Sequence, residues 1–199
     1  MVVDLVSGKA KRVLDGHPST QPEKGVVVNA DGKPLRRPDG RGVEFAADGI
    51  ALTPDGMTLY WQAIKGKTLY RIPTAALIDA MTSDKDVAPS IEKFGENGVA
   101  DGLIIGRESG HMYVSAPEED AVKIRDLAAG AQEKPKVLVS DARLRWPDTF
   151  GEGPDGSIYI TSSHIQDSGF FKPGAPASLP TELWRIVFEK PAAPAGQNL

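Results

Sequence analysis

The chain has 199 residues, of which 25% are charged and 40% hydrophobic, a composition typical of a folded domain and not of a charge-rich disordered polymer. Its formal charge of -4 comes without a basic run, which argues against nucleic acid as a partner. No apolar stretch approaches the roughly 20 residues of a transmembrane helix, and the absence of cysteine excludes disulfides and thiolate nucleophiles.

The beginning of the chain is predicted to contain two small hairpins. Residues 1–14 fit a strand, a turn at Ser7-Gly8-Lys9 and a second strand. Residues 26–35 fit a hairpin around Asp31-Gly32, because an Asp-Gly pair between apolar runs is a turn signal.

A repeated motif follows, in which an aspartate precedes an apolar run, a glycine-containing turn and an aromatic strand. It begins at Asp48, Asp101 and Asp148, about 50 residues apart. Several short strands in each unit of this length are typical of the four-stranded antiparallel blades of a β-propeller. The sequence therefore predicts an all-β propeller with blades at 48–100, 101–147 and 148–189.

Turn signals within the repeats divide them into strands. The strands expected in the first two units are 50–53, 58–62, 68–72, 103–105, 112–115, 121–125 and 136–139. A short helix is expected at 73–80, and the third unit carries a long loop, 162–180, before a strand at 183–188. Residues 190–199 are expected to form a tail.

The number of blades predicts an incomplete ring. Residues 1–47 would supply the outer strands of an incomplete blade plus a hairpin insertion, which makes about three and a half blades in all, of a probable six. Propellers close with roughly four to eight blades, so the chain is expected to be truncated. Unpaired blade edges are expected to cause self-association.

Three carboxylates are the strongest candidates for chemistry. Asp48, Asp101 and Asp148 each precede an innermost strand, so they are expected to converge at the mouth of the central channel. A hard cation such as Ca²⁺, which takes oxygen ligands, would relieve their mutual repulsion. In the alternative interpretation, each aspartate and its neighbour only shape a turn or cap the strand.

Other side chains are predicted to face the same mouth. Trp146 could stack on a substrate ring or pack between blades, His164 could donate to a ligand or be solvated, and Gln62 ends a strand nearby. The chain lacks a phosphate-binding loop, a dinucleotide fingerprint and a nucleophile elbow, which disfavours nucleotide and serine-hydrolase chemistry.

Several segments resemble the C-terminal half of bacterial major royal jelly/yellow-related proteins. They are Val3 to Ala10, Gly49 to Gly56, Leu69 to Thr74 and Trp146 to Thr149. This resemblance implies a six-bladed propeller, related in architecture to the calcium-dependent gluconolactonase/regucalcin (SMP-30-like) family, and an extracytoplasmic location, periplasmic or secreted.

The lactonase resemblance also implies roles for two aspartates. Asp48 stands where that family has an asparagine ligand of calcium, and Asp101 where it has an aspartate ligand that is also a candidate general base. A glutamate ligand of that family has no counterpart. Two functions remain open: a divalent-cation-dependent hydrolase of small lactones or cyclic esters, and a non-catalytic propeller that binds a small molecule. An interaction scaffold is disfavoured, because no exposed stripe repeats from blade to blade.

Overall fold

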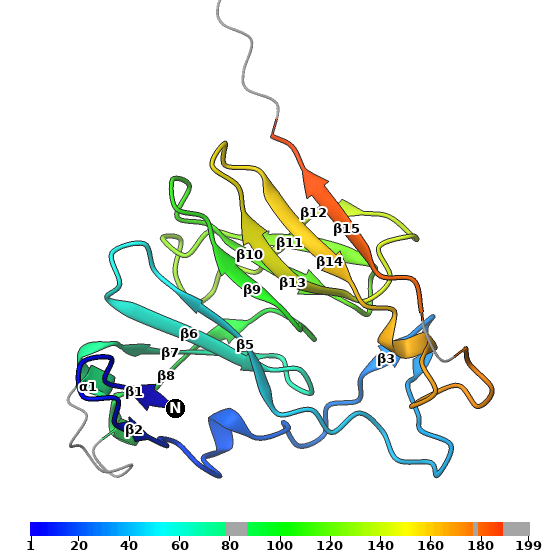
Figure 1. Cartoon of the computed structure of the whole chain (residues 1–199), viewed down its shortest axis with the longest axis horizontal. Helices are drawn as coiled ribbons and strands as arrows, with labels where there is room; N and C mark the ends of the chain where they lie inside the picture. Colours follow the sequence, from blue (N-terminus) through cyan, green and yellow to red (C-terminus); the bar gives the residue numbers. More distant parts are fainter. Residues whose placement is uncertain (79–86, 177–178, 189–199) are drawn as a thin grey trace, which may run out of the picture.

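The computed structural model of the chain describes residues 1–78, 87–176 and 179–188, and these form antiparallel sheets that fan out side by side (Figure 1). Blade 1 contains β5 (Ala47–Leu52), β6 (Thr58–Ala63), β7 (Thr68–Pro73) and β8 (Glu92–Glu96). Blade 2 contains β9 (Leu103–Ile105), β10 (Met112–Ala116), β11 (Ala121–Arg125) and β12 (Lys136–Ser140). Blade 3 contains β13 (Pro147–Glu152), β14 (Ile158–Ser162) and β15 (Glu182–Ile186). The predicted class, an all-β propeller built from four-stranded antiparallel blades, is confirmed.

Strand positions agree with the sequence to within a few residues, because each turn carries its own signal. β9 and β11 have the predicted bounds, whereas β5 begins three residues earlier than expected. The predicted helix at 73–80 is the single turn α1 (Ala75–Ile78), and residues 79–80 lie outside the described residues, as does the predicted tail. The prediction did not include β8, whose charged sequence lacks a strand signal.

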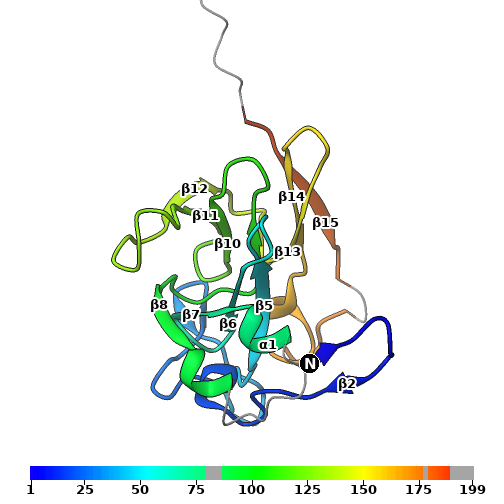
Figure 2. The same cartoon turned by 90° about the vertical axis from the view of Figure 1, so that its left-hand side faces the viewer.

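The region before blade 1 forms two separate hairpins and one short helical turn. β1 (Val2–Val3) pairs with β2 (Ala10–Lys11), and β3 (Asn29–Ala30) pairs with β4 (Lys33–Pro34), at the predicted positions. The helical turn of this region is η1 (Pro18–Thr20), whereas η2 (Ala88–Ser90) precedes β8 and η3 (Ile165–Asp167) follows β14. Figure 2 shows the first hairpin beside blade 1, and Leu14, which follows the hairpin, packs with Trp61, Ile72 and Val87.

Apolar side chains fill the spaces between the blades. Ala51, Tyr60 and Leu69 of blade 1 pack against Leu103 and Met112 of blade 2. A second cluster joins Tyr113 and Val122 of blade 2 to Ile158 and Ile160 of blade 3. Because these contacts hold the sheets face to face, the innermost strands β5, β9 and β13 lie next to one another.

The segment between the first hairpin and blade 1 covers the end of the blades where the inner strands begin. Val28, Leu35 and Val43 of this segment pack against Val99 and Trp146. Its tip is bound by polar contacts as well, since Asn29 donates from its backbone N–H and its Nδ2 to Glu118 Oε1 at 2.7 and 2.8 Å.

In the described part of the chain, no helix is long and apolar enough to cross a membrane.

Candidate functional site

Two glycines bring the inner strands together. A Cβ atom on Gly49 would lie 2.3 Å from the carbonyl oxygen of Asp101, and one on Gly102 would lie 1.9 Å from that of Asp148. Real Cβ atoms essentially never approach closer than 3.0 Å, so a larger residue would push the strands apart. Gly49 lies inside β5, and neither glycine has a positive φ. In Asp48-Gly49 and Asp101-Gly102, the glycine therefore allows two inner strands to pack closely and does not form a turn.

This close approach places the three predicted aspartates around one cavity. Asp48, Asp101 and Asp148 line a cavity of about 410 Å³. The covering segment, the first residue of β5 and two loops supply the rest of its wall, namely Glu44, Phe45, Ala46, Ala47, Ile64 and Ile165. The cavity thus has acidic groups contributed by all three blades and an apolar side.

Asp101 is the most deeply placed of the three carboxylates. It is 8% exposed, and its Oδ2 accepts a hydrogen bond from Trp146 Nε1 at 2.7 Å. The backbone N–H groups of Asp101 and Gly102 donate to Ser115 Oγ at 3.0 and 2.8 Å, and Ser115 is fully buried. These bonds fix both ends of the residue, so the direction of the carboxylate is set by the fold.

Burial and neighbouring charge perturb the acidity of this group. Burial, with the charges of Asp148 and Asp48, raises the pKa of Asp101 to about 7, although the bond from Trp146 favours the ionised form. Burial and the charge of Asp148 also raise the pKa of Asp48. A carboxyl group with a pKa near 7 can both take and release a proton at neutral pH.

The carboxylates fit a hard cation by chemical type but not by arrangement. Oxygen ligands are those that Ca²⁺ takes, and no ion pair joins Asp48, Asp101 or Asp148 to a basic side chain among the described residues. In the same part of the chain, however, no three Asp, Glu, His or Cys side chains are grouped so that they could hold a metal ion.

The three predicted substrate contacts lie elsewhere. Trp146 is fully buried, and its indole packs in the apolar cluster under the covering segment while bonding to Asp101. Gln62 is 1% exposed, and its Nε2 donates to the carbonyl oxygens of Gly66 and Gly98. His164 has a positive φ of 52° and lies 3.8 Å from both Asp167 and Glu182, and it does not line the cavity. The structure therefore places Trp146, Gln62 and His164, which were predicted to face the mouth, outside the lining of this cavity.

Gln62 instead belongs to a buried polar network. Its Oε1 accepts from Asn97 Nδ2 at 3.2 Å, and Asn97 Oδ1 accepts from Arg125 at 3.1 Å. Arg125 is fully buried and also donates to the carbonyl oxygens of Glu96 and Ala131. This network joins blade 1 to blade 2 and explains the burial of Gln62 without a ligand.

An ionic cluster that the sequence does not predict holds the covering segment at the mouth. Arg145 pairs with Asp31 of the hairpin at 2.9 Å and with Asp167 of the blade 3 loop at 2.8 Å. These bonds hold the pKa of Asp167 down at about 2. Arg145 and Asp31 are 114 positions apart in sequence, and no local pattern predicts their pairing.

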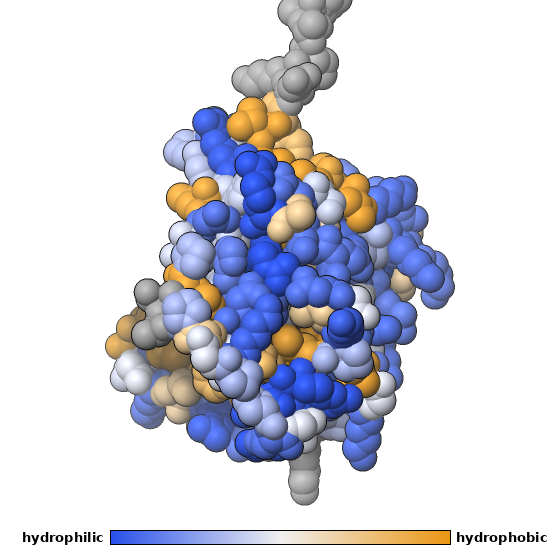
Figure 3. Space-filling view, turned by 90° about the vertical axis from the view of Figure 1, so that its right-hand side faces the viewer, coloured by the Kyte–Doolittle hydropathy of each residue, from blue (hydrophilic) through white to orange (hydrophobic). Residues whose placement is uncertain are grey.

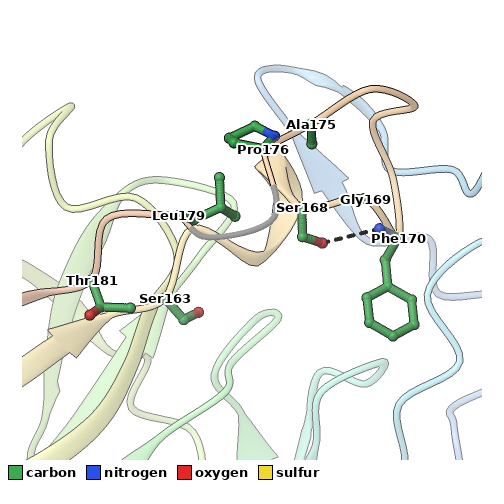
Figure 4. A pocket seen from close by; sticks show the side chains of 8 residues that line it. All are labelled: Ser163, Ser168, Gly169, Phe170, Ala175, Pro176, Leu179 and Thr181. Carbon is green, nitrogen blue, oxygen red and sulfur yellow. Dashed lines mark hydrogen bonds between the residues drawn. The ribbon is translucent and has the colours of Figure 1, made fainter.

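A second, larger cavity lies under the long loop of blade 3. It has a volume of about 660 Å³, and Figure 4 shows Ser163 and Thr181 on one side of it and Phe170 on the other. It is lined by none of the three aspartates, so the cavity at the inner strands remains the candidate site.

Comparison with known proteins identifies only distant structural likenesses. No protein-family model matches the chain, and no curated protein matches its sequence. Regucalcin from Agrobacterium tumefaciens, a calcium-binding protein, is 21% identical over 61% of this chain and 41% of its own, with a TM-score of 0.39. A gluconolactonase from Xanthomonas campestris is 13% identical over 85% of this chain and 55% of its own, with a TM-score of 0.47. A luciferin-regenerating enzyme is 16% identical over 73% of this chain and 46% of its own, with a TM-score of 0.48.

The chain spans about half of the length of these three proteins. At such identities and TM-scores, the comparisons assign no activity to it. They include regucalcin and gluconolactonases, whereas the resemblance to royal jelly/yellow-related proteins and the truncation of the chain stay predictions.

Proposed function

We propose that the cavity at the inner strands is the site of a lactonase-like hydrolase that acts on small lactones or cyclic esters. The observation that carries the proposal is the buried carboxylate of Asp101, which opens onto a cavity shared with Asp148 and Asp48 and has no cationic partner among the described residues. Such a carboxylate is a base available to a water molecule in the cavity.

In the proposed reaction, Asp101 takes a proton from water while the water oxygen bonds to the carbonyl carbon of the ring ester. The ring C–O bond then breaks, and the proton held by Asp101 passes to the departing ring oxygen, which yields a hydroxy acid. The apolar side chains of Phe45, Ile64 and Ile165 would pack against the ring carbons. Asp101 is thus both the proton acceptor and the proton donor.

A lactone-hydrolysis assay tests this function. Hydrolysis of D-glucono-1,5-lactone above the spontaneous rate is expected for the whole chain, and Asp101→Asn is expected to lower kcat by about 100-fold or more. The matched control is Asp126→Asn on an exposed turn, where an asparagine Oδ1 can still accept from the N–H of Ala128. Equal rates for wild type and Asp101→Asn would refute the role of Asp101.

Calcium is the cation to test at this site. Ca²⁺ bound at these carboxylates would raise the melting temperature of the chain relative to chelator, and substitution of Asp48 or Asp148 by asparagine would reduce that shift. If the melting temperature is the same in Ca²⁺ and in chelator, the proposed hydrolysis depends on the residues of the chain alone.

A second function, non-catalytic binding of a small molecule, is favoured by one observation. The cavity combines an apolar side with a few polar groups, which is the usual character of a small-molecule pocket. Saturable binding of a lactone without turnover would support this second function and refute the first.

A further inference from the structure

A third cavity, the side cavity, lies on the face of blade 1 that points away from blade 2. It has a volume of about 270 Å³, and Ala47 and Asp48 line both this cavity and the one that holds Asp101. The cavities under the blade 3 loop and beside Trp184 share no residue with the candidate site. Figure 3 shows the side of the molecule on which the blade 3 loop lies, and that side is mainly hydrophilic.

A bulge at the start of β5 explains how neighbouring residues reach two cavities. Ala47 pairs with Ala63 of β6. Ile50 pairs with Trp61, so β5 carries one extra residue between the two pairs. Bulges of this kind redirect side chains and are frequent next to active sites. Because Asp48 lies within the bulge and lines both cavities, the two cavities meet at this residue.

The side cavity has an apolar lining that is held in place by the core. Trp61 is 6% exposed and stacks on Tyr70 with ring centroids 5.8 Å apart, and its Nε1 donates to the carbonyl oxygen of Ser19 at 3.0 Å. The N-terminal hairpin and α1, which Figure 2 shows beside blade 1, contribute to the walls. Among the apolar side chains of the lining are Val2, Val13, Leu14, Leu59, Ile72 and Leu77.

The charges of the candidate site restrict the molecules that can use the side cavity. An alkyl chain is the group that a small apolar cavity favours. A free fatty acid is disfavoured, because Asp48, Asp101 and Asp148 repel an anion and form no ion pair with a basic side chain among the described residues. A neutral ring ester that carries an alkyl chain avoids this repulsion.

We propose that the side cavity binds the alkyl chain of a lactone whose ring lies beside Asp101. This inference rests on the proposed function and names the substrate class of the same site, neutral lactones with a linear alkyl substituent. The chain passes Asp48 and lies against Ile50, Trp61 and Leu77. Ile50 is 59% exposed in the free protein, so the bound chain covers apolar surface that otherwise faces water.

A series of γ-lactones tests the substrate class. From γ-butyrolactone through γ-hexalactone to γ-octalactone, kcat/KM is expected to rise about threefold for each added carbon, because each carbon buries further apolar surface. Ile50→Gln is expected to lower kcat/KM for γ-octalactone by about threefold or more and to leave that for γ-butyrolactone unchanged.

Leu52→Gln is the matched control for this series. Leu52 is 49% exposed and lies on the same strand as Ile50, but it does not line the side cavity. The control is therefore expected to keep the full gain from the alkyl chain. A wild type that hydrolyses all three lactones equally well, or an equal gain in the two variants, would overturn the proposal.

A binding measurement separates this proposal from the proposed hydrolysis. The probes are 2-pyrrolidone and 5-butyl-2-pyrrolidone, the lactams that correspond to γ-butyrolactone and γ-octalactone, because a ring amide resists hydrolysis. The butyl compound is expected to bind about tenfold or more tightly than the other. It is also expected to shift the indole N–H resonance of Trp61, one of three tryptophans, which is assigned with Trp61→Phe.

The binding results distinguish the two claims. Tighter binding of the butyl compound at Trp61, without turnover of any lactone, would refute the hydrolase and support the side cavity as an alkyl site. If the two lactams bind equally well, or if the Trp61 resonance does not move, the proposal is wrong even where lactones are hydrolysed.

Discussion

Replacing Gly102 by alanine should separate the inner strands of blades 2 and 3. The new Cβ would lie 1.9 Å from the carbonyl oxygen of Asp148 and 3.3 Å from Phe150 Cδ2. Because backbone atoms are involved, relief to 3.0 Å requires a shift of the strands of about 1 Å, and overpacking of this kind costs about 1–3 kcal/mol or more. For a chain of this size, such a loss lowers the melting temperature by about 2–12 °C.

Differential scanning calorimetry on Gly102→Ala and Gly151→Ala measures this effect with a matched control. Gly151 lies in the inner strand of blade 3, and a Cβ there would meet no atom within 4 Å. Its replacement is expected to leave the melting temperature unchanged or to raise it slightly, since alanine restricts the unfolded chain. If both variants melt alike, the glycines do not set the spacing of the inner strands, and our explanation of the convergent aspartates is wrong.

Three further substitutions test the site and its support. Urea titrations would compare the free energy of unfolding of the wild type with that of Asp101→Asn, and we expect the difference to fall by up to about 4 kcal/mol between pH 4 and pH 7. The reason is that the folded pKa of Asp101 is raised to about 7, so over this range the unfolded state releases the Asp101 proton before the folded state does. Trp146→Phe should raise the pKa of Asp101 further in a carboxyl titration, since it removes a hydrogen bond to the ionised form. Arg125→Leu should cost about 3 kcal/mol or more by chemical denaturation, because buried carbonyl oxygens lose their donor. The first prediction would be contradicted by a pH profile equal to that of Asp101→Asn, the second by an unchanged pKa of Asp101, and the third by an unchanged denaturation midpoint.

The sequence carried enough information to predict the blades and the convergence of the three aspartates. The repeat begins each time at an aspartate, and turn residues mark each strand, so both could be predicted locally. The function of the two glycines could not be predicted, because the atom that excludes a Cβ at Gly49 or Gly102 is a backbone oxygen about 50 residues away in sequence.

The position of the predicted substrate contacts depended on long-range packing. Trp146 has a positive φ of 50°, and that conformation turns its indole into the core beneath the covering segment, where Asp101 accepts its N–H. The covering segment has no repeat to place it. One of its attachments is made by Arg145, which pairs with Asp31 across more than 100 residues. Neither fact has a local sequence signal.

The pKa of Asp101 is the property on which the proposed chemistry depends most directly. It can be measured from the carbonyl ¹³C shift of the side chain, titrated by NMR in the wild type and assigned with Asp101→Asn. We expect a midpoint near 7 and a lower one in Asp148→Asn, because Asp148 contributes to the raised value. A midpoint near 4 that does not respond to Asp148→Asn would contradict a buried, charge-coupled base at the inner strands.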